Sequence, residues 1–405
     1  MLGFLHPDSQ ALALKEAEFM VRRKIAVVGV GTVGAQALYS LAGREGVEVH
    51  GFERYNPGHA NGAAGGEGRI FRRVLGAQDE YRPLIDRAFT LWNLLEQDIG
   101  RRLRSFTGSL TIALHGSTYA RMMESEAERA GRTLESLSPE AMRRLYSFQH
   151  FHDSDIGLLD HDGGVIRSEL TNLLTARAAE GRGARIHSSE EVLDISEASH
   201  GVTIATSKAV YAFDQVIVTT GAWAHQLAPA VASTVHVHKP VSGWFVPKDE
   251  GALFGPGPVF GRSAPIQFYG IPNADQRMVK LGYAGMRQTA ILTAPEPSDY
   301  FVSPQELEHF AEIVETHFPG LHPEPVRVNA YFEGYTDDAR PVLQKTSSRV
   351  TLALGFSGNG FKFAPALGEV AADLALDEAT AVDVSFLRRD FGAFVAGASN
   401  TATPA

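Results

Sequence analysis

The segment Lys24–Arg54, KIAVVGVGTVGAQALYSLAGREGVEVHGFER, constrains the fold of this chain more than any other stretch. A short β-branched apolar run over Lys24–Val30 predicts a strand that is buried on both faces. Ala35–Ala42 then has helical periodicity, and Val47–Glu53 predicts a second strand. Strand, helix and strand in this order form a βαβ unit, so we expect an α/β protein with a parallel sheet.

The first turn of this unit predicts a dinucleotide site. It matches the pattern G-x-G-x-x-G, and an acidic residue closes the second strand 19 residues after the last glycine. In such a unit the glycines permit a tight bend and close approach of a pyrophosphate to the helix N-terminus, and the acid accepts from a ribose hydroxyl. A glutamate favours a free 2′-OH, hence NAD or FAD over NADP. The residues expected here are Gly29, Gly31, Thr32, Val33, Gly34, Glu53 and Arg54.

The route of the chain after this unit favours FAD over NAD. An NAD dehydrogenase normally completes its nucleotide domain with further βαβ units directly after the second strand. Here the chain enters the glycine-rich stretch His59–Val74 (HANGAAGGEGRIFRRV), and the next buried strand of this kind, QVIVTT, begins only at Gln215. A nucleotide domain assembled from distant segments fits a FAD-binding fold.

The glycine-rich stretch itself suits a flat ligand beside an anion. Glycines let the backbone approach a ligand closely, because no Cβ intervenes. Arg69 and Arg72 are three residues apart and would share one face of a helical turn. A flexible surface loop that leads into a solvated basic turn remains the alternative on these residues alone.

A second glycine-rich stretch lies near the end, LGFSGNGFKFAPALGEVAADLAL over Leu354–Leu376. Its glycines precede a predicted helix, whose N-terminal amides favour negative charge. Lys362 falls in the first turn of that helix, where a cation opposes the macrodipole. An anion in front of the lysine explains this position, and a solvated lysine is the alternative.

The remaining elements predict two interleaved domains rather than two consecutive ones. The expected class is α/β, with a FAD-binding Rossmann-like domain interleaved with a substrate domain of antiparallel sheet plus helices. The FAD-binding domain is expected over 24–80, 155–234 and 340–390, and the substrate-binding domain over 81–154 and 235–339, with an extension at 1–23 and a tail at 391–405. Helices are predicted at Tyr81–Arg104, Pro139–Tyr146, Gly164–Gly181, Ser303–His317 and Ala364–Leu376. Strands are predicted within Ala184–Ile195, Val202–Ser207, Ala209–Phe213, Gln215–Thr220, Val235–Val246, Gln267–Gly270, Met278–Gly282 and Val350–Gly355.

Composition excludes several classes of function. A formal net charge of −10 disfavours a nucleic-acid partner, and no apolar run approaches the length of a membrane span. The chain has no cysteine, which excludes disulfides and thiolate metal sites and is compatible with the cytoplasm, where we expect the protein. His236 and His238 share a strand face but have no third ligand at a suitable spacing, so no metal site is predicted. Asp337–Asp338 predicts a turn with an ion pair, and a role near the cofactor remains open.

Five motifs together resemble a known family. They are VVGVGTVG, NGAAGGEGRIFR, TTGAW, YGIPNADQRMVKLGY and GFSGNGFKF. In order and internal spacing they are similar to the monomeric sarcosine oxidase and N-methyltryptophan oxidase group of flavin amine oxidases, within the D-amino-acid-oxidase-like superfamily. The likeness covers Lys24–Leu376. It implies an FAD-dependent oxidase that converts the C–N bond of an amino acid or N-alkyl amino acid to an imine and reduces O₂ to hydrogen peroxide.

The resemblance also implies roles for individual residues. Arg72 and Lys362 would clamp the substrate carboxylate, with Tyr269 and Tyr331 as pocket walls. Arg69 and Lys280 would lie on the opposite face of the flavin, where the lysine ammonium would stabilise the charge that develops on oxygen. Besides the residues of the first turn, those implied to hold FAD are Ala63, Ala64, Arg69, Ile70, Val192, Gly221, Trp223, Gly358, Asn359, Gly360, Phe361 and Lys362.

The chain departs from the family pattern at five positions. Asn329 stands where the family commonly has the cysteine that carries its flavin, so FAD is expected to be bound non-covalently. Ala64, Gly65, Gly68 and Ala284 stand where larger family residues are expected, which favours a bulkier or different substrate than sarcosine.

Two other functions stay open at this level. One is a dehydrogenase of the same fold that passes electrons to a quinone or a carrier protein. The other is a non-catalytic FAD- or NAD-binding sensor, which Arg72, Lys280 and Lys362 together disfavour.

Overall fold

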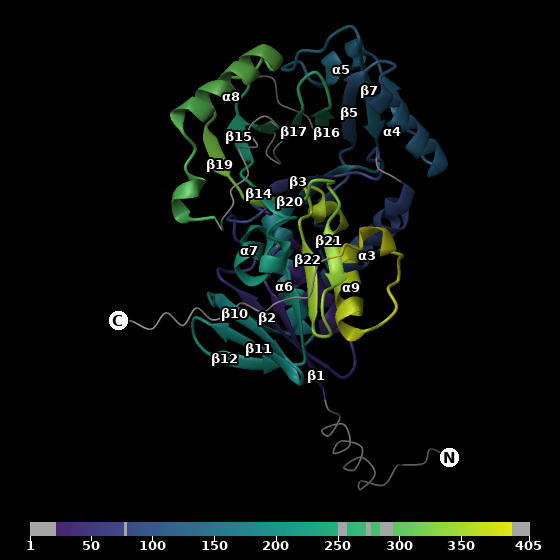
Figure 1. Ribbon diagram of the computed structural model, residues 1–405. Helices are drawn as coiled ribbons and strands as arrows, with labels where there is room; N and C mark the ends of the chain where they lie inside the picture. The colour runs from purple at the N-terminus through teal and green to yellow at the C-terminus, as the bar shows by residue number, and fades with distance from the viewer. Residues whose placement is uncertain (1–21, 77–78, 250–256, 273–276, 284–294, 391–405) are drawn as a thin grey trace, which may run out of the picture.

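The computed structural model describes residues 22–76, 79–249, 257–272, 277–283 and 295–390. Two large sheets organise it: a six-stranded sheet flanked by long helices, and an eight-stranded sheet with helices of its own (Figure 1). The expected α/β class with an interleaved antiparallel domain is confirmed.

The six-stranded sheet is parallel except at one edge. Its order is β21-β22-β13-β1-β2-β9, and only β21 runs antiparallel to its neighbour. The central strand β1 pairs with β2 on one side and with β13, which follows much later in the chain, on the other. Such a reversal of strand order creates a crevice at the carboxyl ends of the strands, where open α/β sheets bind ligands. The strands are β1 (Arg23–Val28), β2 (Val47–Glu53), β9 (Arg185–Ser188), β13 (Gln215–Val218), β21 (Val342–Lys345) and β22 (Val350–Leu354).

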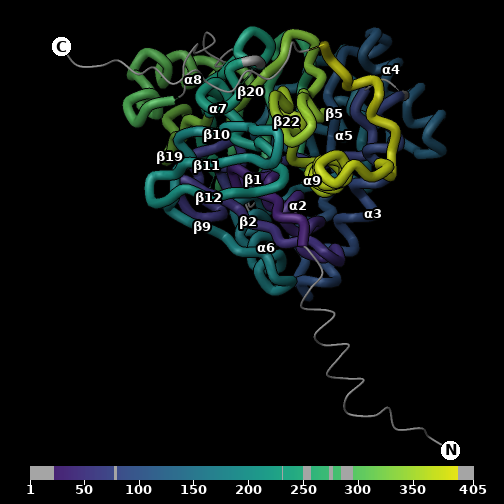
Figure 2. Tube along the Cα trace, turned by 60° about the horizontal axis from the view of Figure 1, so that its bottom comes forward, coloured from purple at the N-terminus to yellow at the C-terminus, as the bar shows by residue number. Residues whose placement is uncertain are grey.

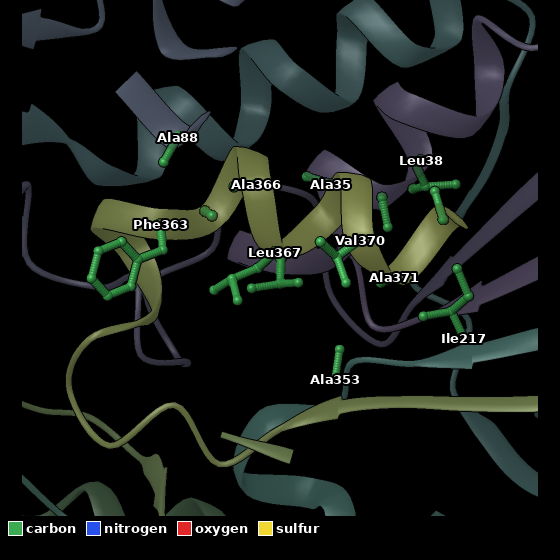
Figure 3. Packing of buried hydrophobic residues seen from close by; sticks show 14 of the residues in the cluster. Ala35, Leu38, Ala88, Ile217, Ala353, Phe363, Ala366, Leu367, Val370 and Ala371 are labelled. Atoms are coloured by element: carbon green, nitrogen blue, oxygen red, sulfur yellow. The ribbon is translucent and has the colours of Figure 1, made fainter. Parts of the chain in front are cut away.

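Helices cover one face of this sheet. Figure 3 shows α9 between the helices that carry Leu38 and Ala88 and the strands that carry Ile217 and Ala353, all members of one buried cluster. A Cβ on Gly368 of α9 would lie 2.5 Å from Cβ of Gln36, so a glycine lets α9 and α2 pack closely. The helices are α2 (Thr32–Ala42), α3 (Arg82–Ile99), α6 (Ser168–Gly181) and α9 (Gly360–Leu376).

A small antiparallel sheet covers the other face. Its apolar residues, among them Ile195, Val202 and Ile204, share a buried cluster with Val28 and Val216 of the six-stranded sheet. Figure 2 shows these strands crossing in front of β1 and β2. They are β10 (Val192–Ala198), β11 (Gly201–Thr206) and β12 (Val210–Phe213), with the short helix α7 (Ala224–Leu227) beside them.

The eight-stranded sheet forms the second half of the molecule. Its order is β19-β15-β18-β17-β16-β5-β7-β6, with β16 and β5 as its parallel pair. Phe310 of α8 packs on Phe245 with ring centroids 5.1 Å apart, within an aromatic core. Its strands are β5 (Ser109–Leu114), β6 (Glu135–Leu137), β7 (Asp155–Asp160), β15 (Val241–Phe245), β16 (Val259–Arg262), β17 (Phe268–Pro272), β18 (Val279–Tyr283) and β19 (Arg327–Ala330), and its helices are α4 (Thr118–Arg129), α5 (Pro139–Leu145) and α8 (Pro304–His317).

Short strands join the two halves. They are β3 (Gly68–Phe71), β4 (Arg104–Ser105) and β8 (Gly164–Arg167) in one small sheet, and β14 (His236–His238) with β20 (Glu333–Tyr335) in another. Short 3-10 helices lie at Asp79–Tyr81, Gly221–Trp223, Pro229–Val231, Pro297–Tyr300 and Ser385–Leu387. The glycine-rich stretch contains β3, which pairs with the strand before α6. Arg69 therefore stands on a strand and not on the helical turn that was expected.

Two predicted helices are shorter than expected. The predicted helix Tyr81–Arg104 ends at Ile99, because Gly100 adopts a left-handed conformation, and the chain continues into β4. The first four residues of the predicted helix Gly164–Gly181 are strand β8, because they pair with β3 and β4. The helix begins only at Ser168.

Two elements pack in the other domain from the one to which the sequence assigned them. Helix α3 falls in the range 81–154 that was assigned to the substrate domain, yet Leu84, Trp92 and Leu95 belong to the buried cluster around α9. Strand β7 falls in the range assigned to the FAD domain, yet it pairs with β5 and β6 of the eight-stranded sheet. Residues 1–21 of the predicted extension and the predicted tail 391–405 lie outside the described residues.

Candidate functional site

A first cavity opens at the carboxyl ends of the central parallel strands. Most residues that were expected at the cofactor line it. They are Gly29, Gly31, Thr32, Val33, Glu53, Arg54, Ala63, Ala64, Arg69, Val192, Gly221, Trp223, Gly358, Gly360 and Phe361.

The glycines of the first turn meet different surroundings. Gly29 has φ +92°, and a Cβ there would lie 2.8 Å from the carbonyl oxygen of Thr219. A Cβ on Gly34 would lie 1.9 Å from the carbonyl oxygen of Gly29. A glycine at this position therefore allows close packing within the turn itself, and it does not line the cavity. Around Gly31 a Cβ would meet nothing within 4 Å. Because Gly31 also lines the cavity, this open space is available to a ligand.

The N-terminus of α2 and Glu53 supply the polar groups of this cavity. Helix α2 begins at Thr32, and its N-cap residue Gly31 supplies no side-chain cap, which leaves backbone N–H groups for an anion. Glu53 is 5% exposed and accepts from the backbone N–H of Val30 (2.8 Å) and of Tyr55 (2.9 Å). Burial would raise the pKa of Glu53, but His59 at 3.4 Å and the backbone donors hold that pKa below its usual value. An ionised carboxylate therefore faces the cavity.

The residues present fit FAD. The glycine turn, the uncapped helix and the carboxylate match the pyrophosphate and ribose of a dinucleotide. Within the described part of the chain, buried polar atoms of Thr220 and Trp223, both lining residues, have no hydrogen-bond partner. A bound group in this cavity would give them partners.

A second cavity adjoins the first and has a volume of about 510 Å³. It lies between the glycine-rich stretch, the start of α9 and the eight-stranded sheet. Arg69, Glu333, Gly358 and Phe361 line both cavities. The expected residues that line the second cavity alone are Ile70, Arg72, Tyr269, Asn359 and Lys362.

Arg72 and Lys362 bring positive charge to the second cavity. Arg72 Nη1 donates to Thr111 Oγ1 at 3.1 Å, and Lys362 Nζ donates to Asn359 Oδ1 at 2.7 Å. Among the residues that the structure describes, neither cation forms an ion pair with a carboxylate. Burial and then the charge of Arg72 lower the pKa of Lys362 to about 7, against an opposing effect of Glu333. The pair is suited to a carboxylate ligand.

Lys280 lies behind the glycine-rich stretch and lines neither cavity. It is 1% exposed, and its Nζ donates to the carbonyl oxygens of Gly66 (3.1 Å) and Gly68 (3.3 Å). The rings of Trp244 and Tyr331 each lie with their centroid 5.6 Å from Nζ. Burial, and then the charge of Arg69, lower the pKa of Lys280 well below its ordinary value.

Arg69 and Tyr331 pack on the same stretch. Arg69 donates from Nε to the carbonyl oxygen of Ala63 at 3.1 Å, and its guanidinium carbon lies 5.3 Å from the ring centroid of Tyr331. Tyr331 was expected as a pocket wall, but it is 1% exposed and lines neither cavity. A Cβ on Gly66 would lie 2.2 Å from its hydroxyl oxygen, so the tyrosine sits directly against the glycines. Tyr269 does line the second cavity, and its hydroxyl oxygen lies 3.1 Å from Ser242 Oγ.

The other sequence candidates lie apart from the two cavities. His236 pairs with Asp337 at 3.1 Å, and His238 packs on Tyr335 with ring centroids 4.8 Å apart. No group of three His, Cys, Asp or Glu that could hold a metal occurs in the described ranges. Asp338 accepts from the backbone N–H of Arg340 and pairs with Arg389.

Sequence reasoning missed four polar residues of this region. Thr111 positions Arg72, Glu333 lies between the cavities, His59 contacts Glu53, and Glu169 binds the glycine-rich stretch. Thr111 and Glu169 act on partners that are distant in the sequence, which leaves no local signal. Only His59, within the quoted glycine-rich stretch, lay where a local signal could have found it.

The chain is similar to known proteins over most of its length. The family model of the FAD dependent oxidoreductases matches residues 24–374. The chain is 28% identical to a monomeric sarcosine oxidase of Streptomyces avermitilis over 364 residues, which cover 88% of this chain and 94% of the relative. It is 29% identical to an N-methyl-L-tryptophan oxidase of Salmonella typhimurium over 371 residues, which cover 89% and 97%.

Two solved structures share the fold. NikD, an unusual amino acid oxidase essential for nikkomycin biosynthesis, superposes with a TM-score of 0.78 at 21% identity, over 93% of this chain and 98% of that one. Glycine oxidase from Geobacillus kaustophilus superposes with a TM-score of 0.73 at 21% identity, over 91% and 100%. In the ranges that the structure describes, no helix is both long and apolar enough to cross a membrane.

Proposed function

Because the chain belongs to the family of FAD dependent oxidoreductases, we propose that it oxidises the C–N bond of an amino acid or N-alkyl amino acid and uses O₂ as electron acceptor. The observation that carries the proposal is the pair Arg72 and Lys362, two cations that line the second cavity. Relatives named as sarcosine and N-methyltryptophan oxidases support the same class of substrate.

The two sets of cations, Arg72 with Lys362 and Lys280 with Arg69, then have separate roles in the reaction. FAD, when bound, supplies the redox chemistry by accepting a hydride equivalent from the carbon beside the nitrogen. Arg72 and Lys362 hold the substrate carboxylate and so fix which carbon faces the first cavity. Lys280, behind the glycine-rich stretch, and Arg69, which lines both cavities, supply positive charge that stabilises negative charge developing on oxygen.

The second cavity supports a substrate that is bulkier than sarcosine. Its volume of about 510 Å³ falls in the range of pockets for drug-sized ligands. Ala64, Gly65 and Gly68, where larger family residues were expected, do not line this cavity, so the support for a bulkier substrate comes from its volume. Ala284, the fourth such position, lies outside the described residues.

The test is anaerobic mixing of the yellow holoenzyme with a panel of L-, D- and N-methyl amino acids. The proposal expects some members to bleach the flavin, and expects one peroxide per turnover when air is admitted. Bleaching without peroxide would show the dehydrogenase instead. Failure of every amino acid to bleach the flavin would favour the non-catalytic sensor.

The two glycines of the first turn give a matched pair of variants. Gly31→Ala is expected to leave the stability of the apoprotein unchanged but to weaken FAD binding by tenfold or more, because its Cβ enters the space kept for the pyrophosphate. Gly34→Ala is expected to destabilise the apoprotein, because its Cβ meets the Gly29 carbonyl. Thermal unfolding of the apoproteins and FAD titration by fluorescence measure both. Equal FAD affinity of Gly31→Ala and wild type would contradict the placement.

The flavin is expected to be held without a covalent bond. The chain has no cysteine, and Asn329 occupies the position where the family tether was expected. Denaturation followed by ultrafiltration should leave all yellow colour in the filtrate. Colour retained with the polypeptide would show a tether to another residue.

The Lys362 ammonium is expected to make substrate capture depend on pH. Its pKa of about 7 means that it is charged below that pH and neutral above it. The ratio of kcat/KM between wild type and Lys362→Met should therefore fall as the pH rises from about 6 to about 9. Lys248→Met, which changes an exposed lysine, is the control and should show a ratio that is flat with pH. A flat ratio for Lys362→Met as well would exclude a role of its charge.

A further inference from the structure

Glu169, at the start of α6, binds the backbone of the glycine-rich stretch. Its Oε1 accepts from the N–H of Gly66 at 2.6 Å, and its Oε2 accepts from the N–H of Glu67 at 2.8 Å. The hydroxyl of Ser168 donates to the same Oε2 at 3.0 Å. An acid in the first turn of a helix suits the macrodipole in any protein, but that does not require two bonds to a loop a hundred residues away.

One peptide unit connects this carboxylate to Lys280. The N–H of the Gly66–Glu67 peptide donates to Glu169, while its C=O accepts from Lys280 Nζ at 3.1 Å. The peptide therefore lies between a carboxylate at its N–H end and an ammonium at its C=O end. Such an arrangement aligns the peptide dipole with both charges, and each bond strengthens the other.

The backbone conformation at Glu67 is one that such bonds stabilise. Glu67 has φ +68°, a left-handed conformation that is uncommon for a residue with a Cβ. Such a conformation persists only where the surroundings over-determine it. Here Glu169 and Lys280 hold the peptide that precedes Glu67, and Arg327 pairs with the Glu67 side chain.

We propose that Glu169 is a positioning residue for Lys280: through the Gly66–Glu67 peptide, its carboxylate fixes the orientation of the Lys280 ammonium and sustains its charge. This inference rests on the proposed function, in which that ammonium promotes the reaction with O₂. Glu169 itself lines neither cavity, so it acts only through the peptide and through its field.

The charges around Lys280 indicate the direction of the effect. Burial and Arg69 of β3 lower the pKa of Lys280, whereas Glu169 of α6, Glu333 of β20 and Glu67 of the glycine-rich stretch raise it. Among the residues that the structure describes, the rings of Trp244, Tyr269 and Tyr331 also lie against the ammonium. Neutralising Glu169 therefore leaves the effect of Arg69 less opposed, and Lys280 loses its proton at a lower pH.

The test uses holoenzyme that has been reduced with dithionite and is then mixed with air-saturated buffer over a range of pH. This measurement needs no amino acid substrate. In wild type the rate of reoxidation should fall as pH rises, when Lys280 loses its proton. In Glu169→Gln the midpoint of that fall should move down by about one pH unit, which is about a tenfold slower reaction on the falling limb. Glu169→Asp keeps the charge and should retain the wild-type midpoint.

Glu180→Gln is the matched control on the same helix. Glu180 pairs with Arg177 near the end of α6, away from the glycine-rich stretch, and its variant should follow the wild-type pH profile. A purely structural role of Glu169 would lower the stability of the protein or its flavin content but would not move the midpoint.

Thermal unfolding of the apoprotein supplies a readout that does not depend on the flavin. Glu169→Gln should lower the melting temperature more in the presence of Lys280 than in a Lys280→Met background, because the two charges are coupled through one peptide. Additive effects of the two substitutions would overturn the inference, even if a variant failed to hold FAD.

The outcomes separate the inference from the function on which it rests. Rapid, pH-dependent reoxidation of wild type with an identical profile for Glu169→Gln would overturn the role of Glu169 and leave the oxidase proposal standing. Reoxidation of wild type no faster than that of free reduced FAD would overturn both.

Discussion

Lys280→Met is expected to slow reoxidation of the reduced enzyme by O₂ by about 10²- to 10³-fold, the usual cost of removing one preorganised donor at a site of developing charge. The rate at which an amino acid bleaches the flavin under anaerobic conditions should stay close to that of wild type, because Lys280 does not line the second cavity. Stopped-flow measurement of the two half-reactions separates the effects.

The size of this effect follows from the surroundings of the ammonium. Lys280 is buried, held by two backbone carbonyls and flanked by aromatic rings, so its charge is poorly screened by water. Charge that develops on oxygen nearby would be stabilised without reorganisation of solvent.

Lys239→Met is the control for loss of a buried lysine. Lys239 is 7% exposed, bonds to the carbonyl of Phe301 and pairs with Glu306, and it lines neither cavity. This variant is expected to lose stability but to keep wild-type reoxidation. If Lys280→Met reacted with O₂ as fast as Lys239→Met, the assignment of Lys280 would be wrong.

Arg72→Ala is expected to raise the KM of the amino acid substrate by about 10²-fold, the range for loss of a bidentate, charge-assisted bond to a carboxylate. An amine analogue that lacks the carboxylate should bind equally well to wild type and variant. Arg72 lowers the pKa of Lys362, so this pKa should rise in the variant. The decrease in kcat/KM that follows loss of the Lys362 proton should therefore occur at a higher pH. Steady-state kinetics over a range of pH measures all three.

The neighbouring arginine is the control for this substitution. Arg73 pairs with Asp86 at 2.7 Å and lines neither cavity, so Arg73→Ala should leave KM unchanged. If Arg72→Ala had the same KM as wild type and Arg73→Ala, Arg72 would not bind the substrate carboxylate.

The parts of the fold that depend on local sequence were predictable. The βαβ unit follows from its apolar periodicity, and its second strand has the predicted bounds Val47–Glu53. The glycine turn and Glu53 could be placed at a cofactor because their spacing alone specifies the geometry. Lys362 could be singled out because a lysine in the first turn of a helix needs an explanation.

The parts that depend on tertiary contacts were not predictable. Strand β8 reads as the start of an amphipathic helix, and only its pairing with β3 and β4 makes it a strand. Glu169 has no local signal, because its partners are backbone N–H groups far away in the sequence. Tyr331 could be recognised from the resemblance, but its position behind Gly66 depends on how the two halves pack together.

The central claim is that the flavin ring lies between two sets of positive charge, one for a carboxylate and one for oxygen. A crystal structure of the yellow protein with a bound carboxylic acid inhibitor tests it most directly. We expect the ring at the junction of the two cavities, with the carboxylate on Arg72 and Lys362 on one face and with Lys280 and Arg69 toward the other. A ring bound elsewhere, or a carboxylate that contacts neither Arg72 nor Lys362, would contradict the claim.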